Sequence, residues 1–412
     1  MSWDELWGSL LAIGRDGSTG GYRRFSWTAE DQQCRAWFAS AAAERDLRTH
    51  CDRNGNLWAW WDSPEASAGT VVPPAGAVVT GSHLDSVPDG GAFDGPLGVV
   101  SAFAAIDLLR ERGVVPARPI AVAAFCEEEG ARFGVACLGS RLLTGAITAA
   151  AARDLRDSGG ISFAEAMAAA GPDPDRIGPD EDLLASIGAY VELHIEQGRA
   201  LADLDSAIGI AEGIWPHGRW RLDFTGQADH AGTAALASRH DPMLPYAATV
   251  LAARQAAATN GTLATFGKVF AEPGGANAVC STVTAWLDAR APDEAALRAT
   301  VDEVLAAADQ ASGAHGVTVA ARAESVTSRV TFDAGLSDSL AASLAARGIT
   351  APVLATGAGH DAGVLAARLP AAMLFVRNPS GVSHAPAEHA DPADCAVGVE
   401  ALAAVLHDLA AR

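Results

Sequence analysis

The chain has 412 residues, of which 49% are apolar and 19% are charged, and its formal charge is −21 at pH 7. This balance predicts a folded protein, and the length predicts two or three domains. An acidic exterior repels phosphate backbones and anionic lipids, which argues against nucleic acid or membrane partners. The N-terminal residues lack the pattern of a signal peptide, and no run of about 18 apolar residues follows, so we expect a cytoplasmic protein.

The six cysteines are scattered along the chain without C-x-x-C pairs. This spacing argues against both a disulfide framework and a thiolate zinc site. We expect reduced, buried thiols, as in a cytosolic protein.

Strand-like and helix-like stretches alternate in the first half of the chain. The run AVVTGS is followed by a helical pattern that begins at Pro96 and ends at Gly113. The runs PIAVAAFC and GAYVELHI then have the composition of short buried strands. Apolar strands separated by helices predict an α/β fold with a mixed, mainly parallel sheet sandwiched by helices. We expect the first part of this domain over residues 1–212.

A different order begins near Gly213. Strand, helix, strand, strand, helix and strand follow one another, which predicts an inserted ferredoxin-like α+β domain over residues 213–326. Its segments are GRWRLDFTG, residues 242–257, TLATFGKVF, VCSTVTAWLDAR, residues 294–311 and VTVAARAE. The apolar runs APVLAT and PAAMLFV and a closing helix then return to the first sheet, so residues 327–412 are expected to complete the larger domain.

Candidate metal ligands follow the apolar strands, at the carboxyl ends where open α/β sheets place their sites. They are His83 and Asp94 in GSHLDSVPDGGAFDG, the acidic run in FCEEEGARFG, His194 and Glu196 in VELHIEQG, and His384 in SGVSHAPAEH. Imidazole and carboxylate ligands suit Zn²⁺ or Mn²⁺, and two such ions can share one carboxylate and activate a water between them. Asp94 is the expected bridge, because the glycines around it allow a tight turn.

Each of these motifs also has an alternative interpretation in which its residues are purely structural. A lone histidine such as His83 is more often a satisfied structural residue than a ligand. The EEEG run suits the solvated first turn of a helix, which favours carboxylates. The combination of three histidines with two acidic clusters, each beside an apolar strand, favours a shared metal site.

Longer strings resemble a known family. H-x-D at 83–85, G-x-x-D-G at 91–95, E-E-G at 128–130, ELH at 192–194 and GVSHAP at 381–386 resemble the co-catalytic dinuclear metallopeptidases and amidohydrolases, which include aminoacylases and carboxypeptidase G. GSHLDSVPDGGAFDGPLG, EEEGARFG, HIEQG, HAGT and GAGHDA resemble the branch of N-carbamoyl-L-amino-acid hydrolases, β-ureidopropionases and allantoate amidohydrolases. The resemblance implies a zinc-peptidase-like catalytic domain, an inserted lid and dimerisation domain, and two divalent ions per subunit (Zn, Mn, Co or Ni).

The resemblance also implies roles at the metal site. His83 and His194 would be terminal ligands of one ion, Glu129 and His384 of the other, with Asp94 between them. Two further residues would assist. They are Asp85, which would hold the second nitrogen of His83, and Glu128, which would be the general base.

The substrate residues follow from the same resemblance. His230 would steady the oxyanion, while Asn277 and Arg290 would bind the substrate carboxylate, for which the planar guanidinium is suited. These three residues can reach across a homodimer into the neighbouring site. Three further residues are assigned near the substrate: Gln197 at its carbamoyl end, and Gly359 and His360 in an active-site loop. His360 is not expected to be a metal ligand.

The function implied is metal-dependent hydrolysis of the ureido C–N bond of an N-carbamoyl-L-amino acid, which releases ammonia, CO₂ and the amino acid. Allantoate is the close alternative substrate, because it also carries a ureido group and a carboxylate one carbon apart. An aminoacylase or dipeptidase is disfavoured by the carbamoylase-like strings. A metal-binding homologue without activity is disfavoured by the presence of Glu128 beside a complete ligand set.

Overall fold

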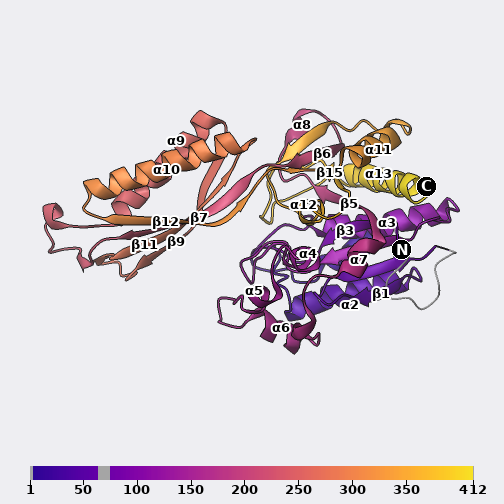
Figure 1. Cartoon of the computed structure of the whole chain (residues 1–412), viewed down its shortest axis with the longest axis horizontal. Coiled ribbons are helices and arrows are strands. Elements are labelled where there is room, and N and C mark those ends of the chain that lie inside the picture. Colours follow the sequence, from indigo (N-terminus) through magenta and orange to yellow (C-terminus); the bar gives the residue numbers. More distant parts are fainter. Residues whose placement is uncertain (1–2, 64–74, 412) are drawn as a thin grey trace. The chain divides into compact units, whose positions relative to one another are not determined.

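The computed structural model describes residues 3–63 and 75–411 (Figure 1). The chain divides into two compact units, the larger formed by Met1–Gly213 with Thr331–Arg412 and the smaller by Ile214–Val330. The larger unit is therefore built from two chain segments that flank the smaller one in sequence. Within the described ranges, no helix combines the length and the apolar character needed to cross a bilayer.

A nine-stranded mixed sheet forms the centre of the larger unit. Its order is β1-β2-β4-β3-β5-β15-β6-β13, and β14 pairs with β6. The four strands β4, β3, β5 and β15 are parallel neighbours, whereas β2 and β6 pair antiparallel with the outer two of them. The strands are β1 (Arg48–Cys51), β2 (Leu57–Trp61), β3 (Ala77–His83), β4 (Ile120–Phe125), β5 (Ile187–Ile195), β6 (Ile208–Ile214), β13 (Val330–Thr331), β14 (Val353–Thr356) and β15 (Ala371–Val376).

The register of the parallel strands brings their carboxyl ends to one edge of the sheet. His83 at the end of β3 is paired with Phe125 at the end of β4, and His194 in β5 is paired with Phe375 in β15. Strands β3, β4 and β15 are buried along their whole length. Their nearly continuous apolar sequences reflect this, because a parallel sheet covered on both faces has no solvated face to alternate with.

Helices of the larger unit supply the layers around this sheet. Residues of α1, α2, α3, α11 and α13 share one large hydrophobic core with the central strands, and α4 and α6 contribute to a smaller cluster around Phe163. Helix α3 begins with Pro96 at its first turn, directly after Asp94 and Gly95. The helices are α1 (Trp3–Leu11), α2 (Ala29–Ala43), α3 (Pro96–Glu111), α4 (Leu138–Thr144), α5 (Ala149–Arg153), α6 (Phe163–Ala169), η1 (Pro174–Arg176), α7 (Glu181–Ser186), α8 (Ala200–Asp203), α11 (Ala334–Ala345), α12 (Asp361–Leu365) and α13 (Pro392–Ala410).

The smaller unit is an antiparallel sheet with two long helices (Figure 1). The sheet order is β12-β7-β11-β9, and apolar residues of the sheet and of α9 and α10 form one core. A two-stranded pair, β8 with β10, lies outside this sheet. The elements are β7 (His217–Thr225), β8 (Asp229–His230), η2 (Leu236–Ser238), α9 (Met243–Asn260), β9 (Leu263–Glu272), β10 (Ala278–Val279), β11 (Thr282–Arg290), α10 (Glu294–Ala314) and β12 (Thr318–Thr327).

The predicted fold class is confirmed, since a mixed sheet with helices is joined by a separate α+β unit of ferredoxin-like strand order. Several short elements were not predicted: β1, β2, β6 and the helices α4, α6 and α7. The pair β1 and β2 extends the sheet antiparallel beside β4, and β6 does so beside β15. Short segments of mixed polarity such as RTHC carry too few residues for a period to be recognised.

Candidate metal centre and active site

Asp94 lies at the centre of the cluster of predicted ligands. Its Oδ1 is 3.2 Å from Nε2 of His194 and 3.6 Å from Nε2 of His83. Its Oδ2 is 3.4 Å from Nε2 of His384, which in turn is 3.8 Å from Oε2 of Glu129. The two oxygens of one carboxylate therefore face two different groups of side chains, His83 with His194 and Glu129 with His384, as a bridging ligand requires.

The rings of His83 and His194 present Nε2 to this carboxylate because their other nitrogen, Nδ1, is occupied. Nδ1 of His194 is 2.8 Å from the carbonyl oxygen of Ile195, and Nδ1 of His83 is 3.1 Å from the carbonyl oxygen of Asp85. An Nδ1–H that donates to a carbonyl leaves a lone pair on Nε2 in the neutral ring. In the neutral tautomer these lone pairs would face carboxylate oxygens, an arrangement that a cation or a proton between them stabilises.

The pKa values show the same demand for positive charge. Although burial disfavours its charge, the contact with Asp94 raises the pKa of His194 to about 9. Burial opposes the charge of Asp94 as well, but its three histidine neighbours hold its pKa well below the usual value. Burial and then the negative charge of Asp94 raise the pKa of Glu129 well above its usual range. The chain alone therefore binds protons at this cluster, and divalent cations would take their place.

Asp85 links the His83 loop to the acidic run after β4. Its carboxylate accepts hydrogen bonds from the backbone N–H of Glu128 at 3.2 Å and of Glu129 at 3.1 Å. Its Oδ1 is also 3.4 Å from Nδ1 of His83, farther than its own carbonyl oxygen. Asp85 thus orients His83 mainly through its backbone carbonyl, while its side chain holds the backbone of the neighbouring carboxylates.

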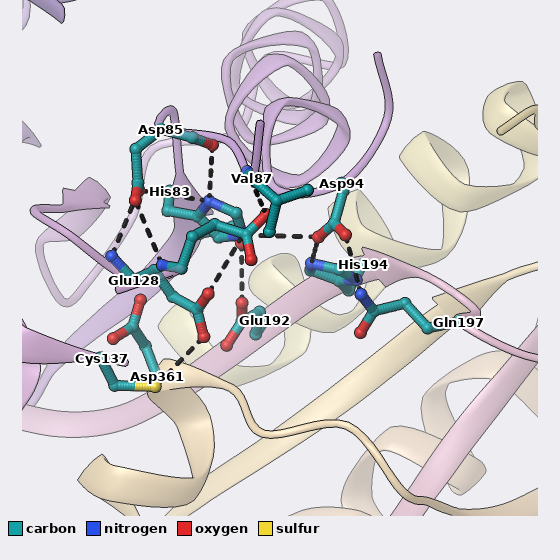
Figure 2. Close-up of polar contacts among 12 residues, drawn as sticks. His83, Asp85, Val87, Asp94, Glu128, Cys137, Glu192, His194, Gln197 and Asp361 are labelled. Atoms are coloured by element: carbon teal, nitrogen blue, oxygen red, sulfur yellow. Dashed lines mark hydrogen bonds and ion pairs between the residues drawn. The ribbon is translucent and has the colours of Figure 1, made fainter. Parts of the chain in front are cut away.

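Glu128 is buried beside the candidate ligand His83 (Figure 2). Its Oε2 is 3.7 Å from Nε2 of His83, and its Oε1 accepts a hydrogen bond from the thiol of Cys137 at 3.1 Å. Burial raises the pKa of Glu128 to about 7, with His83 opposing this shift and Asp85 adding to it. Burial also raises the pKa of the Cys137 thiol well above its usual value, so the thiol keeps its proton.

Glu127 and Glu196, in the motifs FCEEEGARFG and VELHIEQG, accept hydrogen bonds from backbone N–H groups. Glu127 accepts hydrogen bonds from the backbone N–H of Arg132 and Phe133. Glu196 accepts hydrogen bonds from the backbone N–H of Ala200 and Leu201 at the start of α8. Both carboxylates therefore shape the loops that carry the ligands.

Gln197 joins the cluster from the end of β5. Its Nε2 donates to Oδ2 of Asp94 at 2.7 Å and lies 3.2 Å from Nε2 of His384. Its Oε1 is buried and has no hydrogen-bond partner among the residues that the structure describes. This amide oxygen is a free acceptor next to the ligands.

His360 lies behind the first group of ligands, at the N-terminus of α12. Its ring centroid is 4.5 Å from that of His194, and with Glu192 these two residues form a third set of potential ligand atoms. His194 belongs both to this set and to the set with His83 and Asp94, so its one available nitrogen, Nε2, can bind an ion in only one of the two sets. Glu192 is held by the hydroxyl of Ser82 at 2.7 Å and the backbone N–H of Ala362 at 3.0 Å. Gly359 precedes His360, with open space around its Cα.

Backbone conformation also marks this region. Gly95 has φ +83°, and a Cβ at this position would collide with the ring of His83. Three non-glycine residues near the cluster have positive φ, which side chains disfavour: Glu127 (55°), Cys137 (54°) and His384 (56°). Such conformations persist where the surrounding structure enforces them, and they are frequent at functional sites.

The predicted substrate residues of the smaller unit fall into two places. His230 in β8 pairs with Ala278 in β10, and the backbone N–H of Ala231 donates to the carbonyl of Asn277, so His230 and Asn277 lie together. Arg290 ends β11, eight residues after the first residue of that strand, which corresponds to about 27 Å of extended chain. Its guanidinium donates to Asp288 at 2.8 Å. One copy of the unit therefore does not bring all three residues together.

The donor chemistry fits divalent cations. Imidazole nitrogens and carboxylate oxygens converge in two groups that share Asp94, and both groups suit Zn²⁺, Mn²⁺ or related ions. The fold and these groups define a class of α/β proteins with a candidate metal-binding cluster at the carboxyl edge of a parallel sheet. Sequence reasoning missed Glu192 and Cys137, whose contacts depend on tertiary structure.

Comparison with known proteins identifies the family. The model of peptidase family M20/M25/M40 matches residues 79–408, and the chain belongs to this metal-dependent family. The chain is 38% identical to an N-carbamoyl-L-amino acid amidohydrolase of Geobacillus stearothermophilus, over 97% of this chain and 96% of that protein. It is 32% identical to an allantoate amidohydrolase of Escherichia coli strain K12, again over 97% and 96%.

A solved structure agrees with these relatives. An amidase of the hydantoinase/carbamoylase family from Burkholderia vietnamiensis superposes with a TM-score of 0.90 at 28% identity, covering 100% of this chain and 98% of that one. The resemblance seen in the sequence is thereby confirmed. The chain is a hydrolase of the carbamoylase and allantoate amidohydrolase branch.

Proposed function

We propose that this protein hydrolyses the ureido C–N bond of an N-carbamoyl-L-amino acid and releases ammonia, CO₂ and the amino acid. The observation that carries the proposal is the position of Asp94 between two groups of ligands, with Glu128 beside them. Two divalent cations, when bound, supply a water of lowered pKa and polarise the ureido carbonyl. His83, His194, Glu129 and His384 would hold them, with Asp94 shared.

Glu128 is the general base of this proposal. Its pKa of about 7 is matched to taking a proton from the attacking water and passing it to the leaving nitrogen. The carbamic acid that leaves then decomposes into ammonia and CO₂, so one water balances the reaction. The buried Oε1 of Gln197 suits the ureido NH₂ group, because it is an acceptor without a partner among the described residues.

Binding of the substrate carboxylate and of the oxyanion is assigned to the smaller unit. Arg290 supplies a planar guanidinium, while Asn277 and His230 supply further polar groups near the other end of β11. Because one copy separates these residues, we propose a homodimer in which residues of one chain complete the site of the other. His360 and Gly359 would line the substrate near His194.

Substrate choice is tested by ammonia release. Apo-protein reloaded with Mn²⁺, Co²⁺ or Zn²⁺ is compared on N-carbamoyl-L-methionine, allantoate, N-carbamoyl-β-alanine and N-acetyl-L-methionine. We expect the highest kcat/KM for N-carbamoyl-L-methionine. A higher value for allantoate would establish the alternative substrate, amino acid release from the acetyl compound alone would indicate an aminoacylase, and inactivity on all four would overturn the proposal.

The composite site is tested by complementation. A Glu128→Gln chain lacks the base but retains His230 for the site of its neighbour. A His230→Ala chain retains Glu128 but needs His230 from its neighbour. If the site is shared, mixing and reassociating these two inactive variants restores activity in the mixed dimer. Differently tagged chains verify that subunits have exchanged. If the mixture then stays inactive, His230 is not shared between the two chains.

A further inference from the structure

The thiol of Cys137 contacts the carboxylate of Glu128 from the side opposite the ligands (Figure 2). The Sγ to Oε1 distance is 3.1 Å, and the two residues are only 3% and 6% exposed. The other oxygen, Oε2, is the one that faces His83. Each oxygen of this carboxylate therefore has a distinct neighbour.

The chain is folded specifically to return Cys137 to this place. Backbone N–H groups of Cys137, Leu138 and Gly139 donate to the carbonyls of Glu128, Glu127 and Cys126 in succession, which closes the loop between them. Cys137 has φ 54° and ψ 36° and precedes the first residue of α4, yet its side chain does not cap that helix. A left-handed conformation at a residue with a side chain is disfavoured, so the loop holds the thiol in place at a local cost.

A carboxylate without a partner on one oxygen would be free to rotate. The terminal torsion of glutamate is broad, so its plane is set by the groups that the oxygens contact. A thiol is a weak hydrogen-bond donor, which suffices to orient a carboxylate. Burial excludes water as a competing donor on this side.

We propose that Cys137 is a positioning residue for Glu128: the S–H group holds Oε1 and so presents Oε2 to the attacking water and the leaving nitrogen. The inference rests on the proposed function, in which Glu128 is the base. The competing interpretation is that Cys137 only fills space, since a buried free cysteine often behaves as a small apolar residue. The two interpretations differ in what serine and alanine do at this position.

Kinetics of Cys137→Ala and Cys137→Ser separate these interpretations. Loss of the donor in Cys137→Ala is expected to lower kcat about tenfold, with KM and metal content unchanged, because a hydrogen bond to a charged group accounts for about that factor. Cys137→Ser keeps a donor and should recover most of the lost kcat. Equal kcat in the two variants, or a loss confined to KM or metal content, would overturn the positioning role.

Cys395→Ala is the matched control, because Cys395 is a buried thiol on α13 within the hydrophobic core. It should lose some stability but retain the kcat of the parent protein. A similar fall in kcat for Cys395→Ala would show that any buried thiol matters through packing, and this too would overturn the proposal.

An infrared measurement tests the contact without activity. The S–H stretching band of Cys137, isolated as the difference between the parent protein and Cys137→Ala, should lie at lower frequency than that of an unbonded thiol. Glu128→Ala should move it back. An unshifted band in an active enzyme would overturn the positioning role alone, whereas a shifted band in a protein that hydrolyses no ureido compound would overturn the proposed function instead.

Discussion

The carboxylate of Glu388 accepts a hydrogen bond from the backbone N–H of Asp94 at 2.9 Å, across 294 residues of sequence. The same oxygen accepts the N–H of Phe93, and the other oxygen accepts the hydroxyl of Ser383, next to His384. A Cβ at Gly91 would collide with this side chain, so the glycine allows the loop to approach it. Glu388 therefore ties the loop of the proposed bridging ligand to the loop of His384.

This relationship predicts that Glu388→Ala weakens metal binding. Partners that orient ligands typically contribute 10- to 100-fold in metal affinity, so we expect a loss of about that size. Competition with a metallochromic chelator measures it. Glu400→Ala is the control, because Glu400 pairs with Arg112 on the exposed surface. Equal affinities for the Glu388 variant and the parent protein would contradict the linking role.

Removal of metal is expected to destabilise the protein. Without cations, buried carboxylates such as Asp94 and Glu129 must be neutralised by protons or nearby histidines, whereas a ligand at 100 times its Kd adds about 2.7 kcal/mol to the free energy of unfolding. Calorimetry should show a lower Tm after chelation and recovery on addition of Mn²⁺ or Zn²⁺. In Asp94→Ala the recovery should be much smaller, and a full recovery there would argue against Asp94 as a shared ligand.

Glu128→Gln should separate catalysis from metal binding. Loss of a general base typically lowers kcat by about 10²- to 10⁴-fold, and the amide preserves the size of the side chain. Elemental analysis should show unchanged metal content. The comparison is Glu129→Gln, in which metal content itself should fall. Substantial activity in Glu128→Gln would exclude this residue as the base.

Gly95→Ala should disturb His83 rather than merely strain a turn. Its positive φ and the collision with the imidazole are expected to destabilise the fold and displace a ligand. Gly113→Ala is the matched control, since Gly113 also has positive φ but nothing within 4 Å of an added Cβ. Denaturant unfolding should show a loss of about 1 kcal/mol or more in both variants. Metal affinity should fall only in Gly95→Ala.

Arg290→Lys should raise KM for the ureido substrate while leaving kcat less affected. Lysine keeps the charge but lacks the planar pair of donors that matches a carboxylate. Arg322→Lys in β12 of the same sheet is the control, because Arg322 is 62% exposed. Steady-state kinetics on N-carbamoyl-L-methionine and on its amide, which lacks the carboxylate, measures the effect. A similar rise in KM for both compounds would show that Arg290 does not bind the carboxylate.

Much of the candidate metal cluster could be predicted because ligand chemistry and strand ends are local features. His83, His194 and His384 each follow or end an apolar run, and the glycines around Asp94 indicated that residue as the bridge. The resemblance to a family added Glu129 and the division of the ligands between two ions. Glu388, Cys137 and Glu192 could not be found in this way. Their side chains act through hydrogen bonds to residues that are far apart in sequence, and no periodicity records such contacts.

By itself, the sequence determined that buried parallel strands alternate with helices and that imidazoles and carboxylates stand at the ends of those strands. It did so because burial on both faces demands continuous apolar runs, which are visible residue by residue. Only the tertiary structure decided that β4, β3, β5 and β15 are neighbours, that Asp94 divides its oxygens between two ligand groups, and that Cys137 returns to Glu128. Strand order and loop closure arise from pairing between distant segments, and the free energy of that pairing is shared over the whole core.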